Sequence, residues 1–128
     1  MNENAKLELR VSELLKELAV PVSISGHIYL RKAIIKLVQD FTKAQQIYKV
    51  LYGEVARDCN TTISRVERAI RHAIGTSWYK GDELIKVRLF GKLRASGPYP
   101  TNGEYITTIA DYIIMANNVC NQLDYQLD

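Results

Sequence analysis

Residues 52–74 have the sequence YGEVARDCNTTISRVERAIRHAI, which predicts two helices joined by a tight turn. Asn60 stands where such a turn needs a residue that tolerates the left-handed backbone conformation. Either of the two threonines that follow can cap the second helix. Ser64 and Glu67 also have the spacing of a capping box, so the first helical residue is open by one or two positions. The pattern is typical of a helix-turn-helix.

The second of these helices, which we expect over residues 62–80, has two chemically different sides. At about 100° per residue its apolar side chains gather on one side. They are Ile63, Val66, Ile70, Ala73 and Ile74. Arg65, Arg68 and His72 project from the opposite side, and Glu67 and Arg71 lie on the flank. A helix that buries one side and presents arginines on the other has the shape of a reader of the DNA major groove.

Each polar residue of this helix has a functional and a structural interpretation. Arginine can form two hydrogen bonds with guanine O6 and N7, worth about 1–3 kcal/mol of discrimination. With the turn beside them, Arg65 and Arg68 are therefore better explained by base contacts than by a solvated surface. Glu67 either accepts a hydrogen bond from cytosine N4 or forms an i,i+4 ion pair with Arg71. Arg71 is better suited to a phosphate, and His72 suits a phosphate or a base.

Charge is unevenly distributed along the chain. The whole sequence carries a net charge of +3, and residues 57–80 alone carry five basic against two acidic side chains. A second basic cluster contains Lys86, Arg88, Lys92 and Arg94, whereas the residues after Gly103 carry four acids and no base. Such asymmetry indicates a positive face suited to a polyanion. A solvated helix surface is the plainer alternative.

Helical periodicity covers nearly the whole chain, and no segment alternates as a strand would. Besides 62–80, we expect helices over residues 7–18, 26–41, 47–56, 82–90 and 102–114. We expect Gly81 to end the helix over residues 62–80 as a C-cap, and Thr101 or Asn102 to cap the start of the helix over residues 102–114. The sequence therefore predicts an all-α fold, a single compact bundle of about six helices with a helix-turn-helix, similar to a winged helix without a clear wing. One domain is expected over residues 1–128, with its core over about 7–116.

Several other classes of protein are disfavoured. The chain has no glycine-rich phosphate loop and no paired carboxylates with a credible base, so an enzyme is not expected. Its two cysteines, Cys59 and Cys120, match no metal or redox spacing, so we expect no metal and no cofactor. The sequence shows no secretion signal, and it has no apolar run of the roughly 18 residues that a membrane helix needs. We therefore expect a cytoplasmic protein.

Residues 64–74, SRVERAIRHAI, resemble the recognition helix of a known family, the DNA-binding effector domain of the stage-zero sporulation response regulator (the C-terminal domain of sporulation initiation transcription factor A). The resemblance extends from about residue 7 to 116. It includes Val20-Pro21, residues 26–31 (GHIYLR), 49–52 (KVLY), 60–62 (NTT) and 100–104 (PTNGE). The eleven-residue block is its most specific part.

The resemblance implies an all-helical domain that binds a short DNA box as tandem domains and regulates transcription at the entry to sporulation. It assigns base contacts to Arg65, Glu67 and Arg68, and supporting or phosphate contacts to Ser64, Arg71 and His72. It places backbone contacts to phosphate at a helix N-terminus that contains Gly26, His27, Ile28 and Leu30. Thr62 and Lys80, at the two ends of the recognition helix, complete the candidate phosphate contacts. Double-stranded DNA and RNA polymerase are the implied partners, with tandem or dimeric binding on DNA.

Two departures from the family bear on regulation and on the recognition helix. The sequence has no receiver domain with a phosphoacceptor aspartate, so we expect either an excised effector domain or a free-standing one. Gly75 stands where the family has a bulkier residue, which would soften the second half of the recognition helix by up to about 1 kcal/mol.

A second hypothesis is a protein-interaction module that pairs with a full-length response regulator and modulates it. Such a module would use the acidic C-terminal helix, around residues 105–112, more than the basic one. RNA binding is less favoured than DNA binding, because A-form RNA hides its major groove from a reading helix.

Overall fold

Six α-helices make up most of the fold in the computed structural model, which describes residues 2–91 and 99–127, with 120–127 described by their backbone alone. The α-helices are α1 (Glu3–Glu17), α2 (Ser25–Gln39), α3 (Tyr52–Asp58), α4 (Ile63–Ser77), α5 (Glu83–Phe90) and α6 (Asn102–Leu127). Short 3₁₀ turns cover Phe41–Gln46 and Trp78–Lys80, and a π-helical turn covers Ile47–Leu51. The predicted all-α bundle is confirmed, and no β-strand occurs in the described residues.

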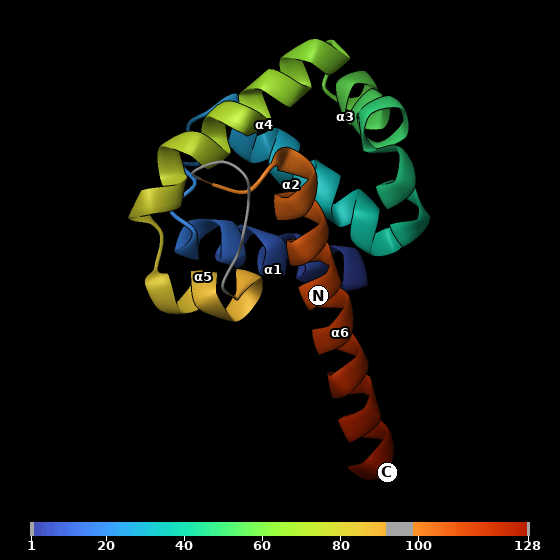
Figure 1. The fold of residues 1–128 in the computed structure, drawn as a ribbon. Helices are drawn as coiled ribbons and strands as arrows, with labels where there is room; N and C mark the ends of the chain where they lie inside the picture. The colour runs from blue at the N-terminus through green and yellow to red at the C-terminus, as the bar shows by residue number, and fades with distance from the viewer. Residues whose placement is uncertain (1, 92–98, 128) are drawn as a thin grey trace.

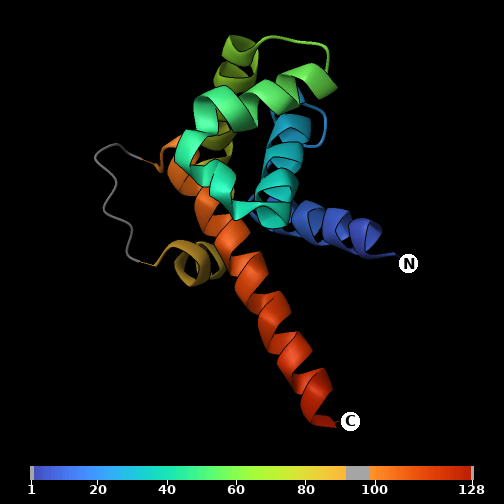
Figure 2. The ribbon, with the colours of Figure 1, turned by 90° about the vertical axis from the view of Figure 1, so that its right-hand side faces the viewer.

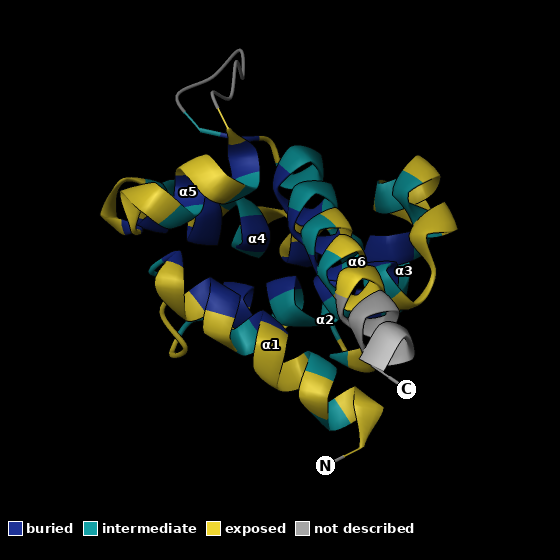
Figure 3. Ribbon diagram, turned by 90° about the horizontal axis from the view of Figure 1, so that it is seen from below, coloured by how far each residue is buried: buried dark blue, intermediate teal, exposed yellow. Residues whose placement is uncertain are grey.

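Helix α2 lies at the centre and packs against α1, α3, α4 and α6 (Figure 1). The core is formed by aliphatic side chains on the inward faces of these helices (Figure 3). Among its fully buried members are Leu15 of α1, Leu30 and Ile34 of α2, Ile70 and Ile74 of α4, and Ile106 and Ile109 of α6. The C-terminal half of α6 extends away from this body (Figure 2). No helix in the described part of the chain has both the length and the apolar character that crossing a lipid bilayer requires.

The contact between α2 and α4 is close enough to need a glycine. A Cβ on Gly26 would lie 2.5 Å from the backbone oxygen of Ala69 and 2.7 Å from the Cβ of Ala73. Real side chains do not approach each other so closely, so the first turn of α2 must have no side chain at this position. Alanines on the facing side of α4 complete a contact in which the two helices meet almost backbone to backbone.

The turn between α3 and α4 has the geometry that the sequence predicts. Asn60 adopts a positive φ of 53°, and the amide of Thr61 donates to the carbonyl of Ala56 at 2.9 Å, which closes the end of α3. Thr62 is the N-cap of α4, because its Oγ1 accepts a hydrogen bond of 3.2 Å from the amide of Arg65. Of the starting points left open by the sequence, the structure selects Thr62.

The chain departs from the predicted helices in several places. The first helix begins at Glu3, and the recognition helix expected over 62–80 ends at Ser77, before the 3₁₀ turn. Residues 47–56, expected as one helix, are divided into the π-helical turn and α3. Leu51, at the end of the π-helical turn, is buried together with Tyr52 and Val55 of α3. Gly81 is the C-cap of the 3₁₀ turn after α4, but its conformation is extended, with φ −71°, and not the left-handed one of a typical glycine cap; a Cβ there would lie 3.1 Å from the carbonyl oxygen of Leu18. The last helix extends well beyond residue 114.

Helix α6 begins with a reciprocal capping box. The amide of Glu104 donates to Thr101 Oγ1 at 3.1 Å, and the amide of Thr101 donates to Glu104 Oε1 at 2.9 Å. Each side chain thus satisfies a backbone donor that the helix itself leaves unpaired. Of the two expected caps, the structure selects Thr101.

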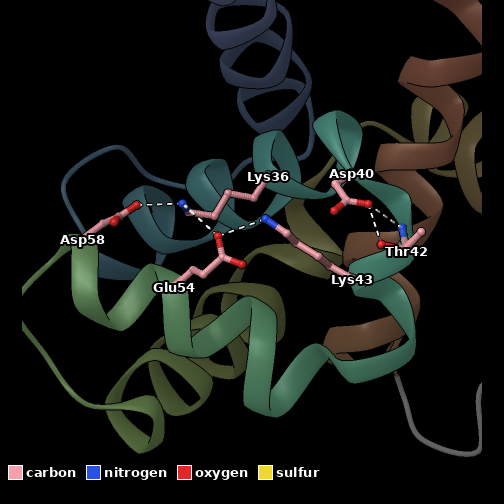
Figure 4. A network of polar contacts seen from close by, with 6 residues as sticks. All are labelled: Lys36, Asp40, Thr42, Lys43, Glu54 and Asp58. Atoms are coloured by element: carbon pink, nitrogen blue, oxygen red, sulfur yellow. Dashed lines mark hydrogen bonds and ion pairs between the residues drawn. The ribbon is translucent and has the colours of Figure 1, made fainter.

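An ion-pair network fastens α3 to α2 and to the turn that follows α2 (Figure 4). Lys36 Nζ lies 2.8 Å from Asp58 Oδ2 and 3.6 Å from Glu54 Oε1, and Lys43 Nζ lies 2.9 Å from the same Glu54 oxygen. The hydrogen bond from Lys36 holds the pKa of Asp58 below its ordinary value and raises that of Lys36. Helix α3, the first helix of the helix-turn-helix, is therefore fixed by charge as well as by apolar packing.

We predict that Gly26→Ala lowers the free energy of unfolding by about 1–3 kcal/mol, because the new methyl group collides with the α4 backbone. Gly53→Ala in α3 is the matched control. The nearest atom to its new Cβ is the Ile63 Cδ1 at 3.9 Å, so the change should be neutral or stabilise by up to about 1 kcal/mol. Urea unfolding measures both. Equal effects of the two substitutions would refute the close helix crossing.

A double-mutant cycle with Lys36→Gln and Asp58→Asn tests the network. At neutral pH we expect a coupling free energy of about 0.2–1 kcal/mol, because both side chains are partly solvated. Since folding lowers the pKa of Asp58 from 3.8, this stabilisation is complete above that value and is lost as the pH falls through the lowered pKa. A coupling that stays constant in strong acid would show that the ion pair is not its source.

Candidate nucleic-acid interface

Helix α4 lies along one edge of the molecule, on the opposite side from the projecting end of α6 (Figure 1). Its inner side is fully buried through Val66, Ile70, Ala73 and Ile74. Its outer side carries the residues selected from the sequence, of which Ser64, Arg65, Glu67, Arg68 and His72 are exposed. The division into an apolar and a basic side is thus the one that the periodicity predicts.

Arg65 and Arg68 are the two exposed arginines of α4. Neither guanidinium group forms a hydrogen bond or an ion pair with another described residue. A guanidinium group carries five N–H donors and no acceptor, so an anionic or acceptor-rich ligand can use all of them without displacing a protein contact.

Two open hollows flank the outer side of α4. One, of about 460 Å³, lies between α4 and the start of α2 and is lined by Ser25, Tyr29, Thr61, Arg65, Arg68, Ala69 and His72. The other, of about 550 Å³, lies on the far side and is lined by Ser64, Glu67, Arg68, Arg71, His72, Gly75, Thr76 and Tyr99. Arg68 and His72 line both hollows and therefore stand on the ridge between them.

Arg71 differs from the other two arginines because the protein already holds it. It is half-buried, its Nη1 donates to the carbonyl of Pro100 at 2.9 Å, and its guanidinium carbon lies 4.3 Å from the centre of the Tyr99 ring. It forms no ion pair with the carboxylate of Glu67; the backbone carbonyl of Glu67 accepts a hydrogen bond of 3.1 Å from Asn102 Nδ2. Of the two interpretations of Glu67, the structure therefore does not support the ion pair, and the carboxylate is exposed.

The start of α2 offers less to a ligand than the sequence indicated. The side chain of His27 is 2% exposed and that of Leu30 is fully buried, so both belong to the core. The His27 amide also donates to the carbonyl of Ile24 at 3.1 Å. Ile24 is the N-cap and provides no side-chain acceptor, and Gly26 is buried against α4, so Ile28 is the one of the four candidates here that is exposed.

The remaining candidates lie at the two ends of α4 and on α5. Thr62 caps α4 at its start, and Lys80 is exposed in the 3₁₀ turn that follows its end. Lys86, counted in the second basic cluster, points inward. Its Nζ lies 2.8 Å from the carbonyl of Trp78 and 2.6 Å from Glu83 Oε1. Arg88 is exposed, and Lys92 and Arg94 lie outside the described residues.

Tyr99 and Pro100 reach the site from the segment before α6, and the sequence analysis did not identify them. One signal pointed to them indirectly. Gly75 is an unusual residue for a helix interior, and it lies one turn beyond Arg71. A Cβ at this position would lie 2.7 Å from the Tyr99 hydroxyl oxygen, so the glycine makes room for the ring.

Comparison with known protein families gives a match over most of the chain. The family model described as sporulation initiation factor Spo0A C terminal matches residues 11–113. The match covers the helix-turn-helix, the packed core and the capping box at the start of α6.

We predict a pH effect from the buried imidazole of His27. Burial, and secondly the charge of Arg31, lowers its pKa from 6.5, so the unfolded chain takes up this proton first as the pH falls. The free energy of unfolding should therefore decrease as the pH falls below 6.5, and His27→Leu should remove that part of the decrease. His72→Gln, on the exposed side of α4, is the control and should leave it in place. The same pH dependence in His27→Leu and the natural protein would contradict this assignment.

Proposed function

Because the chain belongs to the Spo0A C-terminal family of DNA-binding effector domains, we propose that it is a sequence-specific transcription regulator that reads the major groove with α4. The observation that carries this proposal is the state of Arg65 and Arg68. Both are exposed, and their guanidinium groups have no partner among the described residues, on the outer side of a helix whose inner side is fixed in the core. An α-helix with its side chains is about 10–12 Å across, which fits a major groove of about 12 Å.

In the proposed complex, base recognition belongs to three residues near the start of α4. Arg65 and Arg68 each donate two hydrogen bonds to a guanine, and Glu67 accepts one from the N4 amino group of a cytosine. An acidic side chain weakens phosphate binding, so Glu67 is better explained as a specificity element. Its exposed carboxylate, free of Arg71, supports this role.

Phosphate contacts surround this centre in the proposal. Arg71, His72 and Ser64 line the hollow beside Arg68, and Thr62 and Lys80 stand at the two ends of the helix. The exposed backbone near Ile28 adds a contact at the start of α2, where the helix dipole favours an anion. Gly26, His27 and Leu30 take no part in the proposed contacts, because their burial keeps them from the DNA.

The alternative, a module that pairs with a full-length response regulator through residues 105–112, is less well supported. Half of that segment belongs to the core, with Tyr105, Ile106, Ile109 and Ala110 fully buried. Tandem binding to adjacent DNA boxes and contact with RNA polymerase, both implied by the resemblance, remain predictions for this chain.

Selection of bound duplexes from a random pool tests the proposal. We expect a consensus box, and tighter binding to it than to a scrambled duplex of equal length and composition. With roughly 6–10 phosphate contacts per pair of domains, affinity should fall by about 10³–10⁵ between 50 and 200 mM salt. Equal affinity for the matched and the scrambled duplex would refute sequence-specific reading.

Substitutions in α4 separate base contacts from phosphate contacts. Arg68→Ala should cost about 1–3 kcal/mol on the selected duplex and relax the preference at one base position. Arg71→Ala should weaken all duplexes alike and reduce the salt slope by about 1. Arg88→Ala on α5 removes the same charge elsewhere and should have little effect. Equal losses for all three variants on every duplex would show that net charge, and not α4, governs binding.

A further inference from the structure

We propose that Tyr99 is a positioning residue of the DNA-binding face: its ring holds the guanidinium group of Arg71 in place to receive a DNA phosphate. This inference rests on the proposed function and adds to it a residue from outside the helix-turn-helix. Tyr99 is half-buried and belongs to the described segment that leads into α6.

The contacts of Arg71 fix its guanidinium group from two sides. The ring of Tyr99 lies 4.3 Å from the guanidinium carbon, within the range of a cation–π contact. The carbonyl of Pro100 accepts one hydrogen bond from Nη1 at 2.9 Å. Only one of the five N–H donors is thereby used by the described residues, and the others remain available to a ligand.

Gly75 makes this arrangement possible. It lies four residues after Arg71, and therefore one turn further along the same side of α4. A Cβ on residue 75 would lie 2.7 Å from the hydroxyl oxygen of Tyr99 and 3.0 Å from its Cζ. A glycine weakens a helix interior, and the room that Gly75 leaves for the Tyr99 ring explains why a glycine stands at this position. The absence of a side chain at Gly75 leaves room for the ring of Tyr99, and a side chain at position 75 would displace that ring.

The ring also lies at the edge of the proposed DNA-binding face. Tyr99 lines the 550 Å³ hollow together with Ser64, Glu67, Arg68 and His72. An arginine that is held in place before binding loses less side-chain freedom when it meets its partner. Tyr99 therefore strengthens binding through Arg71 and contributes to affinity for all sequences, not to the choice of bases.

Binding of the selected duplex by Tyr99→Ala and Tyr99→Phe, measured between 50 and 200 mM salt, tests the inference. Loss of the ring should weaken binding about two- to tenfold and make the salt dependence shallower. Phenylalanine keeps the ring and should retain the affinity of the natural protein. Tyr112→Ala, which removes an equally half-buried tyrosine beside α1 and α5, is the matched control and should bind normally. A loss as large in Tyr99→Phe as in Tyr99→Ala would refute a role through the ring.

Gly75→Ala separates binding from stability. Alanine favours the helix, so the melting temperature should be kept or raised, whereas the displaced ring should reduce affinity as Tyr99→Ala does. The double variant should bind no more weakly than either single variant, because both act on one contact. Additive losses would show that the two residues do not form a unit.

A measurement without DNA keeps this inference distinct from the proposed function. The NMR signal of Arg71 Nε–H should carry a ring-current shift in the natural protein and in Tyr99→Phe, and lose it in Tyr99→Ala. An unchanged signal in Tyr99→Ala would exclude the stacked arrangement. If the natural protein prefers its duplex and Tyr99→Ala binds it with the same affinity and salt slope, the positioning role is wrong while the proposed function stands. If the natural protein prefers no duplex, the proposed function fails and the positioning role fails with it.

Discussion

The close crossing of α2 and α4 is the constraint on which the rest of the structure depends. At Gly26 the two helices approach until a single methyl group would lie 2.5 Å from the α4 backbone. This contact, together with the fully buried Val66, Ile70 and Ile74, fixes the rotation of α4 about its own axis. Since successive residues of a helix are about 100° apart, fixing the apolar side also fixes the direction of Arg65 and Arg68. Basic residues that could move freely would attract DNA, but they would not be aligned with particular base pairs. The packing of the core therefore determines which side chains the proposed recognition face presents.

Much of this could be predicted from the sequence, because it depends on local patterns. The apolar spacing of residues 63–74 predicts both the buried side of α4 and its exposed arginines, and the structure confirms this division. Asn60 and Thr62 have side-chain properties that a left-handed turn and an N-cap require, and they occupy those positions. The family resemblance, carried by residues 64–74, is confirmed by a match over residues 11–113.

What could not be predicted depends on contacts between distant parts of the chain. The family resemblance implies phosphate contacts at the start of α2, but Gly26, His27 and Leu30 are buried there because α2 is the central helix of the bundle. Lys86 belongs to a basic cluster in the sequence, yet it turns inward to the carbonyl of Trp78. The contact of Arg71 with Tyr99 and Pro100 joins residues nearly thirty positions apart, and no periodicity reports such a contact. Gly75 is unusual in a helix interior, but the reason for it, the room that it leaves for Tyr99, is a contact with a distant segment that the sequence does not reveal.

The most direct test of the central claim is NMR mapping of the isotope-labelled protein as its selected duplex is added. Backbone amide and arginine side-chain signals report which helix meets the DNA, without any substitution that could disturb the fold. The account predicts the largest changes on the outer side of α4, over residues 64–72, with smaller ones at the start of α2. Changes confined to α1, α5 or α6, with the signals of Arg65 and Arg68 unaltered, would contradict it.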